Sequence, residues 1–70
     1  MTTYQIYDMT RSFSDGSSEI KTYLFNDELC MDADFDVLDY VTNPNDCVFA
    51  FIGLITIDND LLPDVLVQGD

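Results

Sequence analysis

Carboxylates are the most abundant ionisable side chains in this sequence, and they are therefore the first candidates for contact with a partner. Fourteen of its 70 residues are Asp or Glu, only Arg11 and Lys21 are basic, and histidine is absent, so the formal net charge is -12. Acids without basic neighbours repel one another and lower the stability of the folded state. A sequence that tolerates this repulsion indicates that the charge is used, and the natural complement of such charge is a strongly basic surface.

The densest row of acids lies between residues 28 and 39. If one helix began at Glu28, acids about four residues apart would fall within a stripe roughly 80° wide at ~100° per residue. Their rise of ~6 Å per step would suit a surface built for phosphates, which are spaced ~3.4 Å along a nucleic-acid strand. We predict a partner-binding surface from this stripe and from acids in the turns: Glu28, Asp32, Asp36, Asp39, Asp15, Glu19, Asp58 and Asp60.

Two other interpretations of the acids compete with this one. An ordinary solvated helix face is acidic too, although such faces usually mix Lys and Arg with the acids. A halophilic origin would give an Asp-rich surface as a general adaptation, but halophilic surfaces usually come with small, weakly apolar residues, and this chain keeps five Phe and four Tyr. Function through charge is therefore the favoured interpretation.

Some of the acids between residues 32 and 43 match the ligand spacing of a calcium-binding loop, but other residues of the same stretch do not. Asp32, Asp34 and Asp36 are spaced like the first three ligands of an EF-hand loop. Val37 stands where that loop needs Gly, and Asn43 stands where it needs Glu, so both the sharp turn and the bidentate ligand are missing. With no histidine, a zinc site is less favoured still, and we expect neither a metal nor another cofactor.

The residue types that support catalysis are also scarce, and we expect no enzyme. No histidine is present to act as a general base or to activate Cys30 or Cys47, and free thiols are favoured over a disulfide in a chain with so few cysteines. Gly16, Gly53 and Gly69 are too scattered for a phosphate loop. Direct nucleic-acid binding would need Lys or Arg at each phosphate contact. The expected partner is a basic nucleic-acid-binding protein.

The first half of the chain predicts a hairpin and a helix. Residues 3–13 and 19–25 alternate as strands around turn residues 14–18. Asn26 and Asp27 are candidate N-cap residues, Asp32 is a second candidate, and the residue before Pro44 is disfavoured in a helix. Where the helix begins, near Asp27 or near Asp32, stays open, and a well-formed helix from Ala33 to Val41 is favoured.

Residues 47–57 predict a long strand that is apolar on both faces. Strict alternation puts one set on one side, Cys47, Phe49, Phe51, Ile55 and Ile57, and another set on the other side, Val48, Ala50, Ile52 and Leu54. A chain this short has little left to cover both faces, so we expect a homodimer. After a turn at residues 58–60, residues 61–67 form either a helical turn or a short strand, and Pro63 favours an edge strand.

The apolar run is too short for a membrane-spanning helix, and the N-terminus carries no basic and apolar leader pattern. We therefore expect a mature chain that begins near Met1 and lies in the cytoplasm, with no membrane contact. At 70 residues the chain suits a single acidic domain, residues 1–70. The expected class is α+β: a small antiparallel sheet from the hairpin, the long third strand and a possible short fourth, with one helix, in the order ββαβ(β).

In its size, its sequence pI near 4.1 and its unpaired acids, the whole chain resembles the small phage-encoded acidic DNA mimics. The resemblance rests on no alignable motif, so it assigns no role to any residue. It implies occupation of the DNA-binding site of a host protein, in the host cytoplasm. Members of this class act on nucleoid proteins of the HU type, uracil-DNA glycosylase, restriction enzymes or CRISPR effector complexes. A small basic dimer of the HU type ranks first, and the alternative is a structural or adaptor subunit of a larger assembly, acidic only for solubility.

Overall fold

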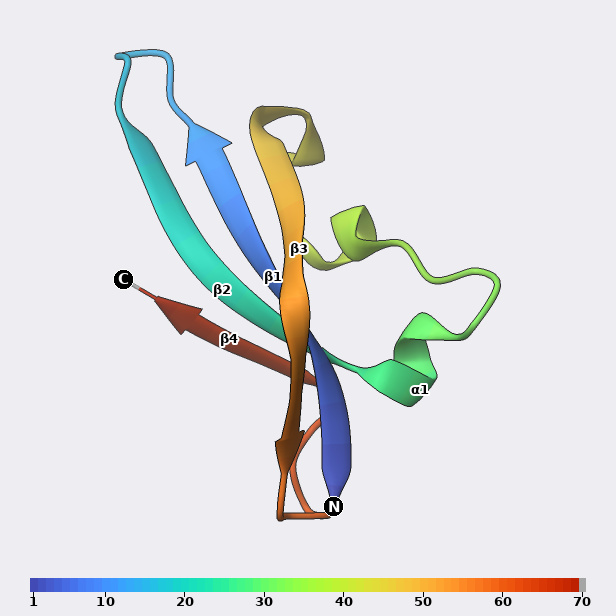
Figure 1. Cartoon of the computed structure of the whole chain (residues 1–70). Coiled ribbons are helices and arrows are strands. Elements are labelled where there is room, and N and C mark those ends of the chain that lie inside the picture. The colour runs from blue at the N-terminus through green and yellow to red at the C-terminus, as the bar shows by residue number, and fades with distance from the viewer. Residues whose placement is uncertain (70) are drawn as a thin grey trace.

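A computed structural model describes residues 1–69 as one four-stranded antiparallel sheet with short helices beside it (Figure 1). The strands, in the sheet order β3-β1-β2-β4, are β1 (Thr2–Ser12), β2 (Ser18–Asn26), β3 (Cys47–Ile57) and β4 (Val65–Gly69). Between β2 and β3 lie helix α1 (Asp27–Cys30) and two 3₁₀ helices, η1 (Val37–Tyr40) and η2 (Pro44–Asp46). The expected α+β class and antiparallel sheet are confirmed, while the single longer helix is not.

The predicted hairpin is confirmed as β1 and β2, which pair from Tyr4 opposite Asn26 to Ser12 opposite Ser18. The tip loop, residues 13–17, begins one residue earlier than the sequence indicated. Gly16 has a φ of 90°, a conformation in which a side chain would be strained. The alternation of polar and apolar residues stops in the loop that contains Gly16, where the chain reverses. This is why the alternation alone predicts both strands.

Strand β3 pairs with β1 along its length, but a β-bulge interrupts the register. Ile6 lies opposite Gly53 and Tyr7 lies opposite Phe51, so Ile52 is the extra residue. A bulge shifts the alternation of side chains by one residue. The expected single apolar side is therefore wrong, because Ile55 shares a face with Tyr4 whereas Phe51 shares the opposite face with Tyr7.

The core lies between one face of the sheet and the crossover segment, which we define as residues 27–46. Met9, Tyr23 and Phe25 are buried from the sheet side, and Phe25 is fully buried. Residues of the crossover segment pack against them: Leu29, Cys30, Phe35, Val37 and Val41. The Phe25 ring lies 5.4 Å from the Phe35 ring and 5.2 Å from the Tyr40 ring, centroid to centroid. Aromatic contacts of this kind stabilise a core beyond the area that they bury.

The opposite face is closed only at one end, by the connector, which we define as residues 58–64. Because β3 and β4 are the two edges of the sheet, the connector has to pass across β1 and β2. The hydroxyl of the fully buried Tyr4 donates to the Pro63 carbonyl at 2.6 Å, and the Asn26 N–H donates to the Asp64 carbonyl at 2.8 Å. The final strand follows Pro63 at the sheet edge, as predicted.

The helix predicted from Ala33 to Val41 is wrong. Within that range only η1 is helical, and α1 begins at Asp27 and ends at Cys30. Asn26 caps α1 by accepting a hydrogen bond from the Glu28 N–H at 3.0 Å. Aspartate side chains compete for backbone N–H groups and so favour turns over helix interiors, and three of the six residues from 31 to 36 are Asp. Within residues 1–69, no helix is long and apolar enough to cross a membrane.

Removing the Phe25 ring should unfold much of the population. Phe25→Ala leaves a cavity between sheet and crossover segment, and such a change costs about 3–5 kcal/mol. Phe13→Ala is the control, since Phe13 lies in the tip loop and is 45% exposed, and it should cost less than about 1 kcal/mol. Urea unfolding followed by circular dichroism measures both. Equal losses would show that the aromatic cluster does not carry the stability of the fold.

Candidate interaction surfaces

The predicted helical stripe of acids does not form. Glu28 lies in α1, Asp32 in the turn after it, Asp36 at the N-cap of η1 and Asp39 within η1. The Asp32 Oδ1 accepts from the Asp34 N–H at 3.1 Å, and the Asp36 Oδ1 accepts from the Leu38 N–H at 3.0 Å. These carboxylates are exposed along the crossover segment, but they follow turns rather than the regular rise of one helix.

The other predicted acids lie at opposite ends of the sheet. Asp15 and Glu19 are at the hairpin tip, beyond or beside the Ser12–Ser18 pair. Asp58 and Asp60 follow β3 where Ile57 pairs with Thr2, at the start of β1. The eleven residues of β1 separate the two ends, and a strand of that length spans about 35 Å. The eight predicted residues therefore form three groups, at the tip, on the crossover segment and at the connector.

Most acidic side chains are exposed. Thirteen of the fourteen acids lie in residues 1–69, and those classed as exposed are Asp15, Glu28, Asp32, Asp34, Asp36, Asp39, Asp46, Asp58, Asp60 and Asp64. The predicted surface does not include Asp34, which belongs to no stripe, or Asp46 and Asp64, although these two stand among the acidic turn residues of the sequence. They belong to the same acidic surface by exposure and charge.

Few of these charges are balanced. Within residues 1–69, ion pairs reach only Glu19, whose Oε1 lies 4.0 Å from the Arg11 Nε, and Asp60, whose Oδ1 lies 2.6 Å from the Met1 amino group. The Arg11 guanidinium also donates to the Thr42 carbonyl at 2.7 Å and to the Asn43 carbonyl. Arg11 therefore fixes the end of the crossover segment rather than neutralising its acids.

Two carboxyl groups have lowered pKa values. The Ser17 hydroxyl and the Ser17 N–H both donate to the Asp15 carboxylate, and these hydrogen bonds hold its pKa below the ordinary value. The hydrogen bond from the Met1 amino group, followed by the charge of that group, lowers the pKa of Asp60. Both carboxylates thus stay charged well into the acidic range.

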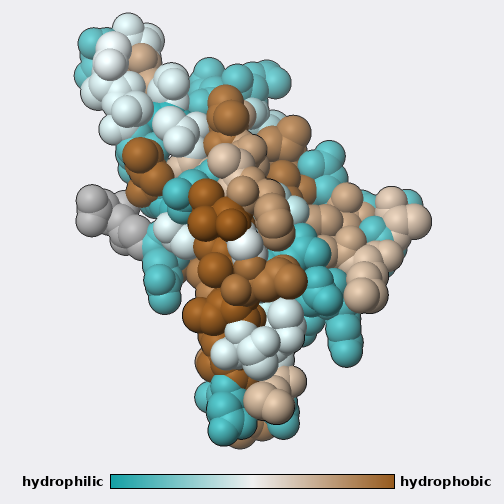
Figure 2. Space-filling view, in the orientation of Figure 1, coloured by the Kyte–Doolittle hydropathy of each residue, from teal (hydrophilic) through white to brown (hydrophobic). Residues whose placement is uncertain are grey.

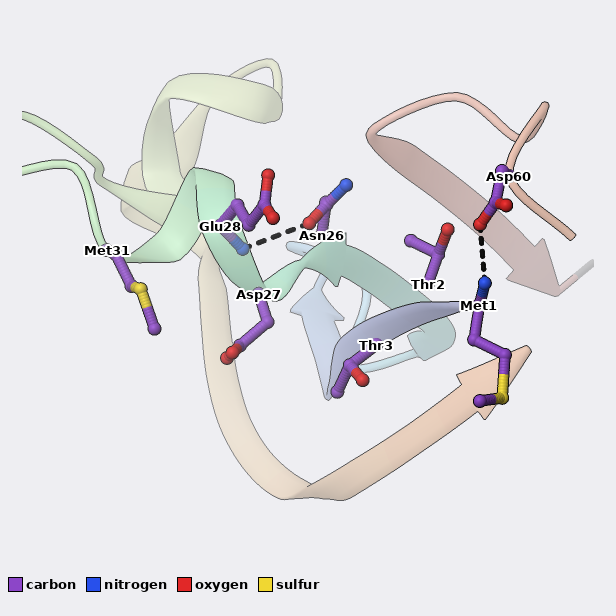
Figure 3. A pocket seen from close by; sticks show the side chains of 8 residues that line it. All are labelled: Met1, Thr2, Thr3, Asn26, Asp27, Glu28, Met31 and Asp60. Carbon is purple, nitrogen blue, oxygen red and sulfur yellow. Dashed lines mark hydrogen bonds and ion pairs between the residues drawn. The ribbon is translucent and has the colours of Figure 1, made fainter. Parts of the chain in front are cut away.

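A shallow pocket lies between the start of β1, α1 and the connector (Figure 3). Its lining residues are Met1, Thr2, Thr3, Asn26, Asp27, Glu28, Met31 and Asp60. In Figure 3 the Asp27 and Glu28 side chains point to different sides of α1, and Asp60 lies across the pocket from them. Asp27 accepts from the Gln5 Nε2 at 2.9 Å. Within residues 1–69, no cluster of acidic, Cys or His side chains could hold a metal ion.

The two cysteines are free and half-buried beside the core, as expected. Burial, and then the negative charge of Asp27, raises the pKa of the Cys30 thiol. A raised pKa keeps the thiol protonated and poorly nucleophilic at neutral pH. Cys30 therefore behaves as a small apolar residue, consistent with its packing against the core.

The second surface is apolar and follows strand β3 (Figure 2). Its exposed members, which we call the β3 edge, are Val48, Phe51, Ile52, Leu54 and Ile55. Each is at least 42% exposed, and no charged residue occurs from Cys47 to Ile57. The apolar character of both faces of this strand was predicted from the sequence. Its place at the edge of the sheet was not, because the alternation of side chains within a strand does not depend on the order of strands in the sheet.

Comparison of the chain with models of protein families finds no match, and comparisons with curated proteins and with solved structures find none either. The acidic surface and the β3 edge are the features of residues 1–69 that bear on function.

The two lowered pKa values predict a pH dependence with a defined sign. A carboxyl whose folded pKa lies below its unfolded value adds stability above the unfolded pKa, and that stability is lost as the pH falls through the folded pKa. Asp15 and Asp60 should thus titrate below the ordinary range of an aspartate in a carboxyl NMR titration. Acetylation of the N-terminus should raise the pKa of Asp60 and leave that of Asp15 unchanged. An equal response of both would contradict the assigned causes.

Proposed function

We propose that this protein is an acidic DNA mimic, which binds the basic DNA-binding surface of a host protein and blocks its access to DNA. A nucleoid protein of the HU type is the first candidate for the target, in the cytoplasm of the host cell. The observation that supports the proposal is the set of ten exposed carboxylates in residues 1–69, of which only Asp60 has an ion-pair partner.

The spacing of the acids also suits such a partner. The tip and connector groups lie about 35 Å apart along β1, which is close to one turn of duplex DNA, about 34–36 Å. A basic cleft that follows the DNA backbone over one turn would meet carboxylates near both ends of this protein. Charge complementarity of this kind raises the association rate and weakens as salt is added.

The cations support a protein partner rather than DNA itself. Each phosphate contact needs a Lys or Arg, and Arg11 donates to two backbone carbonyls of the crossover segment. That leaves Lys21 as the remaining basic side chain. The proposal assigns the protein no catalytic role, since the Asp27 and Glu28 side chains at the pocket point to different sides of α1.

A structural or adaptor subunit is the second candidate, and a separate observation favours it. The β3 edge offers unpaired backbone groups and apolar side chains, which is how a strand joins the sheet of another chain. In that case the acids serve solubility alone, and binding to basic proteins would be weak and without a preferred surface.

The experiment that tests mimicry removes charge from the crossover segment and keeps the shape. Changing Asp32, Asp36 and Asp39 together to Asn retains the side-chain oxygen that accepts each backbone hydrogen bond. The variant should displace labelled duplex DNA from a purified HU-type protein at least about tenfold less effectively, and its displacement should depend less steeply on salt. Thermal unfolding should show it at least as stable as the parent, because repulsion is relieved.

The matched control removes charge from two half-buried acids that lie outside the ten exposed carboxylates, Asp8→Asn and Asp27→Asn, and the two variants are compared per charge removed. The control should compete nearly as well as the parent. Equal losses per charge in both variants would mean that net charge alone drives binding. If the first variant competes as well as the parent, the binding surface lies at the tip and connector, at Asp15, Glu19, Asp58 and Asp60. If the parent displaces no DNA even at low salt, mimicry of HU-bound DNA is wrong.

A further inference from the structure

We infer that the basic partner adds a strand beside β3: an extended segment with apolar or β-branched residues in its middle and Lys or Arg at both ends. The inference rests on the proposed function for the charge of the partner, and it adds the conformation in which the partner binds. Strand β3 has eleven residues and lies at the edge of the sheet. An edge strand with free N–H and C=O groups is a template for a strand of another chain.

The outer side of β3 is open to a second backbone. Within residues 1–69, backbone hydrogen bonds from outside the sheet reach only the two ends of this strand. The Cys47 N–H donates to the Pro44 carbonyl, and the Ile57 carbonyl accepts from the Asn59 N–H at 2.9 Å. The bulge at Ile52 leaves runs of five residues on either side, and each run has the length of an ordinary strand.

The side chains of β3 favour an uncharged middle in the added segment. Phe51 and Leu54 lie opposite Tyr7 and Gln5 on one face of the sheet, and both are more than half exposed. Exposed apolar residues lie on the other face too, at Val48 and Ile55. A strand beside β3 would place its own side chains against both sets, where β-branched and aromatic residues pack well and a charge would lose water without gaining a counter-ion.

The two ends of β3 favour positive charge instead. Asp46 directly precedes the strand and Asp58 directly follows it, and both are exposed. Neither has an ion-pair partner in the part of the chain that the structure describes. Eleven strand residues span about 35 Å, which exceeds the Debye length of about 8 Å at physiological salt. Each carboxylate therefore attracts a cation by itself, and a segment that covers β3 gains from Lys or Arg at each end.

The cations of the chain itself do not reverse this preference. Lys21 lies on β2, which β1 separates from β3. Arg11 donates to two backbone carbonyls of the crossover segment, and the Met1 amino group lies 2.6 Å from the Asp60 carboxylate. An acidic chain, including a second copy with its net charge of -12, would be repelled at both ends of β3 and by the rest of the surface. Charge complementarity thus selects a basic occupant.

The test uses a synthetic peptide of this chemistry, Lys-Lys-Val-Thr-Val-Thr-Val-Thr-Val-Lys-Lys, as the probe. One control peptide carries Glu in place of every Lys. The other carries Pro-Pro in place of the central Thr and the Val after it, which removes an N–H from each side of the strand and keeps the charge. Isothermal titration calorimetry at low salt should show both controls binding at least about tenfold more weakly than the probe.

Matched variants of the protein locate the binding. Leu54→Lys puts a charge on the β3 edge, where Leu54 is 61% exposed, and Leu61→Lys puts the same charge on the connector, where Leu61 is 93% exposed. Both variants change the net charge equally, so a difference between them reports the place. Leu54→Lys should weaken probe binding at least about tenfold and Leu61→Lys less than about threefold, because only the first buries an ammonium group under the added strand.

Hydrogen exchange of the parent covers the case in which Leu54→Lys does not fold. The probe should slow exchange at backbone amides of β3 and leave those of β4 unchanged. Equal binding of the probe and either control peptide, equal binding by the two lysine variants, or no slowing in β3 overturns the inference. A parent that sediments as a dimer without peptide, and as a monomer in Leu54→Lys, overturns it too, since a second copy then occupies the edge.

The inference and the proposed function fail separately. A probe that protects β3, together with a parent that displaces no DNA from an HU-type protein, supports strand addition and contradicts mimicry. Displacement of DNA by the parent and by Leu54→Lys alike, without protection of β3 by the probe, supports mimicry and overturns strand addition.

Discussion

The packing of Phe25 against the crossover segment is the interaction on which the rest of the structure depends. Phe25 comes from the sheet and is fully buried, while Phe35 and Tyr40 come from a stretch that is otherwise rich in aspartate. Within that stretch Leu29, Phe35, Val37 and Val41 pack against the sheet, and most of the carboxylates are exposed to water. The free energy gained by burying the rings thus has to offset two costs. One is the mutual repulsion of the acids in the same segment, and the other is the conformational entropy lost when the segment becomes ordered.

The same charge that opposes folding also controls association. An exposed, uncharged edge strand is a hazard for open-ended aggregation, and a high net charge keeps separate copies apart. Here the second edge is short and begins after Pro63, so growth from both edges of one sheet is disfavoured.

Local pattern predicted the elements whose causes are local. The hairpin follows from alternation and a turn, and the final edge strand follows from Pro63. The prediction of a longer helix was wrong because it rested on the spacing of apolar residues from 29 to 41. The Asp32 and Asp36 side chains accept hydrogen bonds from nearby backbone N–H groups, which favours turns over a continuous helix. The bulge at Ile52 and the edge position of β3 depend on pairing with β1, which is distant in sequence, so no pattern within residues 47–57 could reveal them.

The identity of the candidate acids could be predicted from composition, but their arrangement could not, and the arrangement changes what a partner must look like. A single helical stripe would present one continuous row of charge. The structure instead separates the tip group around Asp15 from the connector group around Asp60 by the length of β1, about 35 Å. That separation exceeds the Debye length of about 8 Å at physiological salt. Each group therefore attracts cations independently, and a partner that binds both groups would have to carry basic residues at two distant places.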